Sequence, residues 1–306
     1  MFDLRYHLAS LAAVFIALAV GILLGVAISG KLSAADNAIA HDRIDQLNDQ
    51  LQQANSRADI IGQRNKAAEQ LLEISYPALM ENRLDGKNVG VLFAGPVDGS
   101  VRSAIERTLS DAGAGDPVRL IAVDTPVDAT ELDGALNGEQ TLAQYAEGGD
   151  DFAGLGTALG RELVDGEGTP MWDSLSSNLV EERSAWTSTP ALDAVVVVRS
   201  WAPPEDPTAE EEAQARPTET LVDGLLSGLQ QSGIPVVGVE TTTEDASAID
   251  LYRTQGVSSV DDVETLAGRV ALAFMLAGGE PGHYGVKESA SDGVAPSVDS
   301  VPVPSG

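Results

Sequence analysis

The sequence of 306 residues contains no cysteine, only three histidines and few basic residues. Without cysteine the chain can form neither disulfides nor thiolate metal sites, so cysteine usage does not indicate its redox compartment. Its 18 Lys and Arg stand against 47 Asp and Glu, which gives a formal net charge of -29. Binding to a phosphate backbone depends on neutralisation by Lys and Arg, so we expect no nucleic-acid partner.

Motifs of catalytic and nucleotide-binding sites are also missing. The chain has no GxxxxGK[ST] loop, GxSxG elbow or HExxH pair. Gly95 follows an apolar run, but Val97 and Ser100 stand where the dinucleotide fingerprint needs its second and third glycines. We therefore expect no catalytic residues, no cofactor-binding residues and no metal ligands.

Residues 8–29 form an uncharged apolar run, LASLAAVFIALAVGILLGVAIS. As a helix rising ~1.5 Å per residue, the run is long enough for a hydrocarbon core about 30 Å thick. A cleaved signal peptide is the alternative, but its apolar region usually has only roughly 7–15 residues. The sequence predicts a transmembrane anchor within residues 1–30, in the plasma membrane, with the bulk of the chain outside the cytoplasm.

Small residues recur at every fourth position of this run, and Gly21 and Gly25 form a GxxxG pair. Lipid offers no hydrophobic drive for helix association, so membrane helices often meet along such a face. The pattern favours pairing of two membrane helices, although Gly and Ala are also common in membrane helices generally.

Apolar and small residues then follow alternating three- and four-residue steps from residue 37 to residue 72. This heptad repeat predicts a coiled-coil stalk over residues 31–76, ending before Pro77. Two a positions carry Asn, which favours a parallel dimer when it pairs with its mate. A helix packed on its own domain is the alternative. The expected seam of a parallel homodimer contains Gly21, Gly25, Asn37, Ile44, Leu47, Leu51, Ile61, Asn65 and Leu72.

Residues 85–288 alternate short Val-rich runs with helical stretches, which is typical of βαβ units with strands buried on both faces. The sequence predicts strands at 89–94, 118–123, 194–199, 235–240 and 257–260, and helices at 100–112, 140–145, 155–164, 218–231 and 261–276. It also predicts an exposed loop at 203–217 and a disordered tail at 289–306. The expected fold class is α/β: a Rossmann-like, mostly parallel domain carried by a transmembrane helix and a stalk.

In open α/β sheets, ligands bind at the carboxyl ends of the strands. The residues that follow the predicted strands form a candidate partner rim: Gly95, Asp124, Arg199, Trp201 and Glu240. Trp and Arg are enriched at interface hot spots, which favours Arg199 and Trp201 as partner contacts, with core packing of Trp201 as the alternative. Asp124 and Glu240 could instead hold Mg²⁺ or Ca²⁺, or be ordinary strand-end acids of an acidic protein.

Three segments together resemble the actinobacterial MctB family, named as copper-transport proteins. They are the opening FDLRYHLASLAAVFIALAVGILLG, the heptad stalk and the late GHYGVKESASDGVAPS. The resemblance implies a membrane-attached envelope protein with a Rossmann-like domain. It implies a role either in copper transport or, as in the septum-associated SteB-like branch, in binding partners during cell division.

Copper ligands are scarce in this chain. Cu(I) prefers thiolate or thioether ligands and Cu(II) favours imidazole, whereas the chain has no Cys, four Met and three His. We therefore expect first a non-catalytic, dimeric, membrane-anchored scaffold that binds an envelope protein. Copper transport or homeostasis is the alternative that the family implies, and a cryptic nucleotide-binding enzyme is the second alternative.

Overall fold

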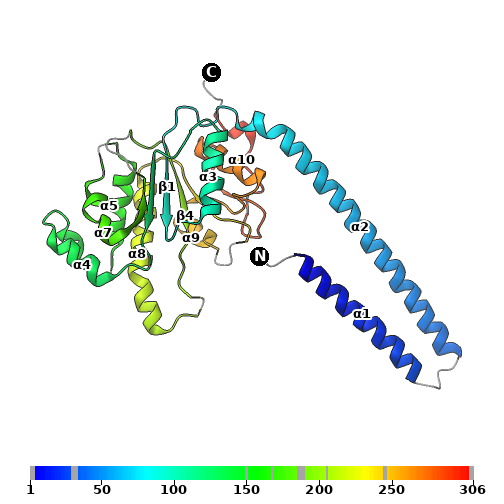
Figure 1. Cartoon of the computed structure of the whole chain (residues 1–306). Coiled ribbons are helices and arrows are strands. Elements are labelled where there is room, and N and C mark those ends of the chain that lie inside the picture. Colours follow the sequence, from blue (N-terminus) through cyan, green and yellow to red (C-terminus); the bar gives the residue numbers. More distant parts are fainter. Residues whose placement is uncertain are drawn as a thin grey trace. The chain divides into compact units, whose positions relative to one another are not determined.

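The computed structural model describes residues 4–28, 34–148, 151–166, 168–184, 190–204, 206–243 and 247–302. The chain divides into two compact units, Met1–Leu71 and Leu72–Gly306. The second unit, which we call the head, contains all the strands of Figure 1.

The first unit is helical. Helix α1 covers Leu4–Ile28 and helix α2 begins at Ala34. Within the part of the chain that the structure describes, no helix combines the length and the apolar composition that a membrane crossing requires. The surroundings of the Gly25, Asn37 and Ile44 side chains lie outside the described part. The predicted anchor and seam therefore stay predictions.

Helix α2 runs without a break over Ala34–Met80, so it passes Pro77 instead of ending before it. Packing of its last turns explains this difference. Tyr76 Oη donates a hydrogen bond of 2.6 Å to Asp111 Oδ2, and the Arg269 guanidinium lies 5.4 Å from the centre of the Tyr76 ring. Met80 is buried in the head. These contacts hold the end of α2 in place, at the cost of the one backbone hydrogen bond that proline cannot donate.

The head is built on one seven-stranded sheet with the order β3-β2-β1-β4-β5-β6-β7. The strands are β1 Val89–Ala94, β2 Arg119–Val123, β3 Val180–Arg183, β4 Ala194–Arg199, β5 Val236–Val239, β6 Ser258–Val260 and β7 His283–Tyr284. All neighbours are parallel except β2 and β3. The mostly parallel α/β sheet and its five predicted strands are confirmed. Strands β3 and β7 were not predicted, β3 because its residues are mostly charged and β7 because it has only two residues.

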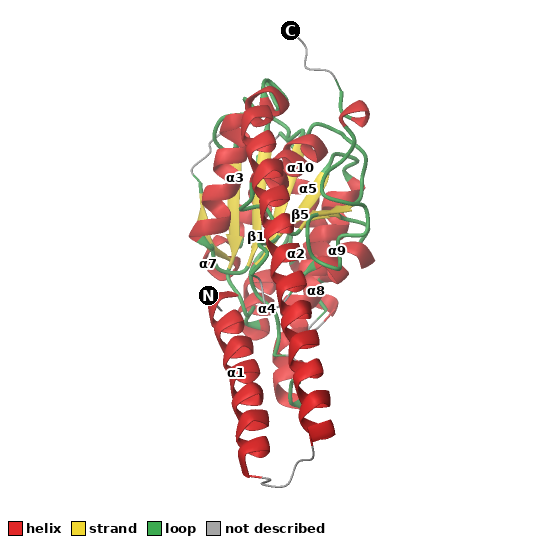
Figure 2. Ribbon diagram, turned by 90° about the vertical axis from the view of Figure 1, so that its right-hand side faces the viewer, coloured by secondary structure: helices red, strands yellow, loops and turns green. Residues whose placement is uncertain are grey.

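Helices cover both faces of the sheet (Figures 1 and 2). Successive residues of β1 point to opposite faces. Leu92 packs into the core beneath α5 (Ala153–Val164) and α8 (Ala209–Gln231), whereas Phe93 packs beneath α3 (Gly99–Asp111) and α10 (Leu266–Leu276). The remaining helices are α4 Ala129–Gly138, η1 Ala143–Gly148, α6 Pro170–Ser174, α7 Ser176–Leu179, α9 Ile249–Thr254 and η2 Val298–Ser300.

The loop predicted for residues 203–217 is wrong from residue 209 onward, because α8 begins there. Thr208 and Glu211 form a capping box, and three glutamates lie in the first turn, where the helix dipole stabilises negative charge. The helix predicted at 140–145 is also displaced. Helix α4 ends at Gly138, and the short helix η1 at Ala143–Gly148 is the next helical segment.

The tail differs from its prediction as well. Of residues 289–306, which the sequence predicts to be disordered, the structure describes 289–302, and these lie on the head. Val301 is buried in the core beneath α3 and α10, and Ala295 packs against the same core. The segment was predicted to be disordered because it is rich in Ser and Pro, a composition that gives no sign of these two apolar contacts.

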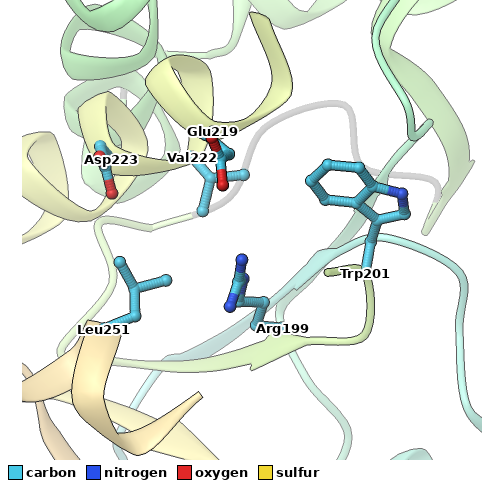
Figure 3. Close-up of a pocket in the computed structure, with 6 residues that line it drawn as sticks. All are labelled: Arg199, Trp201, Glu219, Val222, Asp223 and Leu251. Atoms are coloured by element: carbon cyan, nitrogen blue, oxygen red, sulfur yellow. The ribbon is translucent and has the colours of Figure 1, made fainter. Parts of the chain in front are cut away.

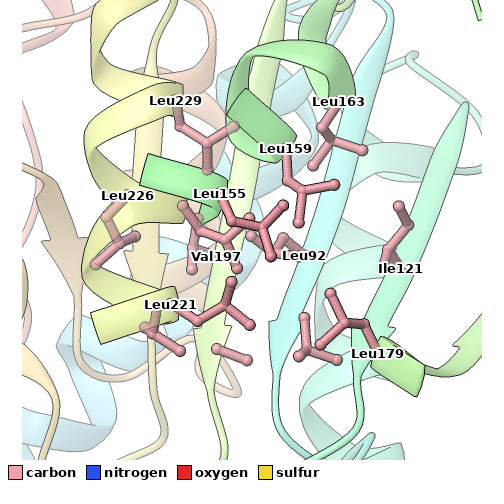
Figure 4. Packing of buried hydrophobic residues seen from close by; sticks show 14 of the residues in the cluster. Leu92, Ile121, Leu155, Leu159, Leu163, Leu179, Val197, Leu221, Leu226 and Leu229 are labelled. Carbon is pink, nitrogen blue, oxygen red and sulfur yellow. The ribbon is translucent and has the colours of Figure 1, made fainter. Parts of the chain in front are cut away.

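Two glycine pairs set the distance between α5 and α8. Gly156 and Gly160 on α5 face Gly224 and Gly228 on α8, and a Cβ at any of the four would overlap a backbone carbonyl oxygen of the facing helix. The two helices can therefore approach only without side chains at these positions. Around the contact, leucines of both helices fill the space above the sheet (Figure 4). Neither of these GxxxG pairs was predicted from the sequence, unlike the pair in α1.

A buried carboxylate fixes the segment that follows β7. Asp261 accepts hydrogen bonds from the amides of Val286 (2.8 Å) and Lys287 (3.2 Å). Gly285 has φ +141°, and the Asp261 carboxylate occupies the space that a Cβ there would need. The GHYGVKES motif thus has a structural explanation: its second glycine, Gly285, lets the chain wrap around Asp261.

The neighbouring Asp262 is fully buried, and its Oδ1 has no hydrogen-bond partner among the described residues. Thr265 Oγ1 donates a bond of 2.9 Å to Oδ2. Burial, and to a lesser degree the charges of Asp261 and Glu264, raise the pKa of Asp262 to about 6. The folded head therefore holds this proton more tightly than the unfolded chain does.

We predict that Gly224→Ala destabilises the head. Alanine is the better helix former, but the added methyl would meet the Ala153 carbonyl, and overpacking of this kind costs about 1–3 kcal/mol. Urea unfolding followed by circular dichroism measures the change. Gly134→Ala is the matched control, because its Cβ would meet nothing within 4 Å, and it should stabilise α4 slightly. Equal effects of the two substitutions would contradict the tight contact.

We also predict that Asp262→Asn raises stability in a pH-dependent way. Because the folded pKa lies above the unfolded value of 3.8, the stability of the natural protein falls as pH rises from about 4 to 6. The advantage of the variant should grow over this window by roughly 3 kcal/mol. Unfolding free energies across this range test it, with the exposed Asp116→Asn as control. A pH-independent difference would rule out the buried proton.

Candidate functional site

The order of the strands reverses between β1 and β4. From β1 the chain proceeds to β2 on one side, whereas β4 lies on the other side and leads onward to β5. The helices that follow these two strands, α3 and α8, cover opposite faces of the sheet. The carboxyl ends of β1 and β4 therefore form the topological switch point, where open α/β sheets bind their ligands.

The crevice at this switch point is closed by protein. Gly95 has φ +126°, and a Cβ there would lie 2.8 Å from the backbone nitrogen of Trp201. Asp98 Oδ1 accepts hydrogen bonds from the amides of Ser100 (2.7 Å) and Val101 (3.0 Å) at the start of α3. These two amides would face the pyrophosphate of a dinucleotide. Gly95 thus serves the packing of Trp201, and a carboxylate of the chain itself takes the place of a phosphate.

A pocket of about 210 Å³ opens beside Trp201. Arg199 and Trp201 reach it from the end of β4, three residues come from α8, and Leu251 comes from α9 (Figure 3). Its lining residues are Arg199, Trp201, Glu219, Val222, Asp223 and Leu251. The half-buried Trp201 packs on Gly95 with one side and faces this pocket with the other. Both the packing and the contact roles predicted for Trp201 are therefore compatible with its position.

The pocket carries charges of both signs. Glu219 and Asp223 lie four residues apart on α8, so they share one face of the helix. Burial raises the pKa of Asp223, while a hydrogen bond from Gln255 and the charge of Arg199 lower it. Arg199 joins none of the ion pairs found among the described residues. Its guanidinium is therefore available to an anionic group in the pocket.

The two acids of the predicted rim lie apart from this pocket. Glu240 is 4% exposed and binds Lys287 Nζ at 2.6 Å and the amide of Ala248 at 2.7 Å. It holds the segment after β7 in place, so its burial does not fit the prediction that it meets a partner. Asp124 is exposed at the end of β2. Three strand spacings of roughly 4.8 Å separate the two acids, about 14 Å in all, so they cannot share one cation.

Metal-binding groups do not gather in the described residues. Searched within those ranges, the structure contains no group of three or more His, Asp or Glu side chains that could hold a metal ion. His283 Nδ1 lies 2.9 Å from Ser259 Oγ, and burial lowers the pKa of this histidine. Met80 and Met275 are buried in the core beneath α3 and α10.

The two strand-end residues of the pocket, Arg199 and Trp201, were predicted from the sequence, whereas its helix residues were not. The helix predicted at 218–231 contains both Glu219 and Asp223, but the sequence did not indicate that this helix packs above the end of β4. The i, i+4 spacing of these two acids was the available signal. Leu251 had no such signal in the sequence, because α9 has only six residues.

Comparison with known proteins agrees with the resemblance. The family model described as "Copper transport outer membrane protein, MctB" matches residues 1–295. The "Copper transporter MctB" of Mycobacterium tuberculosis (strain ATCC 25618 / H37Rv) is 26% identical over 325 residues, which cover 95% of this chain and 98% of the relative. The protein of the same name from Mycobacterium bovis (strain ATCC BAA-935 / AF2122/97) shows the same 26% identity and coverage. The chain therefore belongs to the MctB family.

Proposed function

We propose that this chain is a membrane-anchored envelope protein that pairs along α2 and presents a non-catalytic head for binding a protein partner. The observation that carries the proposal is the apolar side of α2. Leu47, Leu51 and Ile61 are 51%, 50% and 57% exposed. Large aliphatic side chains at heptad spacing on a 47-residue helix favour a second helix as their partner.

A second copy of the same helix suits this seam best. A parallel partner brings each leucine opposite its mate, and it brings Asn65 opposite Asn65, so that the two amides can bond to each other. Packing of the helix on its own domain is the alternative from the sequence analysis, and the trapping experiment below separates the two.

The anchor is supported by the uncharged run of residues 8–29 and by the helical conformation of α1 over Leu4–Ile28. The family description names membrane proteins, which supports a location at the cell envelope. We propose that α1 is the attachment and that the head lies outside the cytoplasm.

The head offers Arg199 and Trp201 at the switch point as its partner contact. Both residue types are enriched at interface hot spots, and both line an open pocket. The closed crevice beside Gly95 is evidence against a bound dinucleotide there.

Copper transport or homeostasis is the second candidate function, and the printed names of the relatives favour it. Titration of the purified full chain with Cu(I) and Cu(II) separates the two proposals. The scaffold proposal predicts no stoichiometric binding at micromolar metal. Tight binding of either ion, together with copper sensitivity of a deletion strain, would favour copper handling.

Disulfide trapping tests the paired stalk. Because the chain has no cysteine, Leu51→Cys introduces a single thiol at the proposed seam. We expect mild oxidation in native membranes to convert most of this variant to a covalent dimer. Asp49→Cys, on the opposite side of the same turn, is the matched control and should react at least about tenfold more slowly. Similar rates for both positions would exclude the seam.

We further predict that Asn65→Leu strengthens the association but loosens its specificity. The substitution replaces a buried polar pair with apolar contacts, which stabilises coiled coils while admitting other oligomers. Sedimentation of the detergent-solubilised full chain should show tighter association and additional species. An unchanged size distribution and an unchanged unfolding temperature would place Asn65 outside the seam.

A further inference from the structure

We propose that the pocket of Arg199, Trp201, Glu219, Val222, Asp223 and Leu251 binds a small zwitterion, namely an α-amino acid with an apolar side chain. The proposal adds a ligand to the partner rim described above. It does not depend on pairing of α2 or on the membrane anchor.

The charges of the pocket favour a ligand that carries both signs. A guanidinium binds a carboxylate through two parallel hydrogen bonds, and Arg199 is free of ion pairs within the described residues. Glu219 and Asp223 offer two carboxylates to an ammonium group on the α8 side of the same pocket (Figure 3). A simple anion would meet these two acids and a simple cation would meet Arg199, so each would be opposed by one wall.

The size of the pocket favours a small ligand. Its volume of about 210 Å³ lies below the roughly 300–1,000 Å³ of pockets for drug-sized molecules. Val222, Leu251 and the Trp201 ring supply apolar lining between the charged groups. An amino acid with an aliphatic or aromatic side chain fits both the volume and this lining.

The backbone segments that carry the charged groups of the pocket are fixed before any ligand binds. The backbone amide of Arg199 donates a hydrogen bond of 2.9 Å to Tyr252 Oη, and Tyr252 is itself buried. The glycine contact with α5 fixes α8, which carries both acids. Binding therefore needs no ordering of the backbone, and the ordering cost is confined to the side chains.

Calorimetric titration of the purified full chain tests the ligand class. The probes are L-leucine with the other L-α-amino acids, and two leucine analogues that each lack one charge, 4-methylpentanoate and 3-methylbutylamine. We expect saturable binding of at least one apolar amino acid. Loss of a hydrogen bond to a charged group costs about 1.5–3 kcal/mol, so each analogue should bind roughly 10- to 100-fold more weakly.

Variants locate the site. Arg199→Gln and Asp223→Asn should each weaken binding by at least about tenfold, whereas Arg107→Gln, an exposed arginine on α3, should leave it unchanged. Three results would overturn the proposal: no saturable binding of any amino acid, equal binding of the amine and its parent amino acid, or undiminished binding by both pocket variants. Disulfide trapping at position 51 does not involve this pocket. A negative titration would therefore overturn the amino-acid site alone, and a negative trapping result would overturn the paired stalk alone.

Discussion

The close contact of α5 and α8 is the constraint on which the head depends. Four glycines let the two helix backbones meet, and the paired helices then cover one face of the sheet with a continuous layer of leucines. This contact also fixes the position of α8 above the end of β4. The acids of α8 therefore lie beside Arg199 and Trp201, so that the packing of the core determines the chemistry of the rim.

A second constraint acts at the far side of the rim. Asp261 and Glu240 use their charges inside the protein, the first on the amides of Val286 and Lys287 and the second on the Lys287 ammonium. The GHYGVKES segment thus completes the sheet through β7 and neutralises part of a buried acidic cluster. Of the strand-end residues, Arg199 and Trp201 after β4 line the pocket, whereas Gly95 after β1 is buried against Trp201 and Glu240 after β5 binds groups of the head itself.

Much of the fold could be predicted from the sequence because its strands are continuous Val-rich runs, which only a sheet buried on both faces explains. The positions of the residues expected at the rim could be predicted in part. Gly95, Arg199 and Trp201 lie together, whereas Glu240 is buried and binds Lys287, which is 47 residues away in the sequence. Helix α8 was predicted too short because Pro217 suggested a loop. The capping box of Thr208 and Glu211 outweighs that signal. Local sequence patterns indicate which segments form helices or strands. They do not indicate which charged residues distant in the sequence come into contact in the fold.

The chain belongs to the MctB family, and the exposed Leu47, Leu51 and Ile61 of α2 supply a physical reason for the proposed pairing. The central claim is that two copies share this helix. Native mass spectrometry of the full chain released from lipid nanodiscs measures it most directly. A mass of two chains is expected, shifting toward one chain when Leu51 and Ile61 are both replaced by Lys. A single chain in the unmodified protein, under conditions that preserve known membrane dimers, would contradict it.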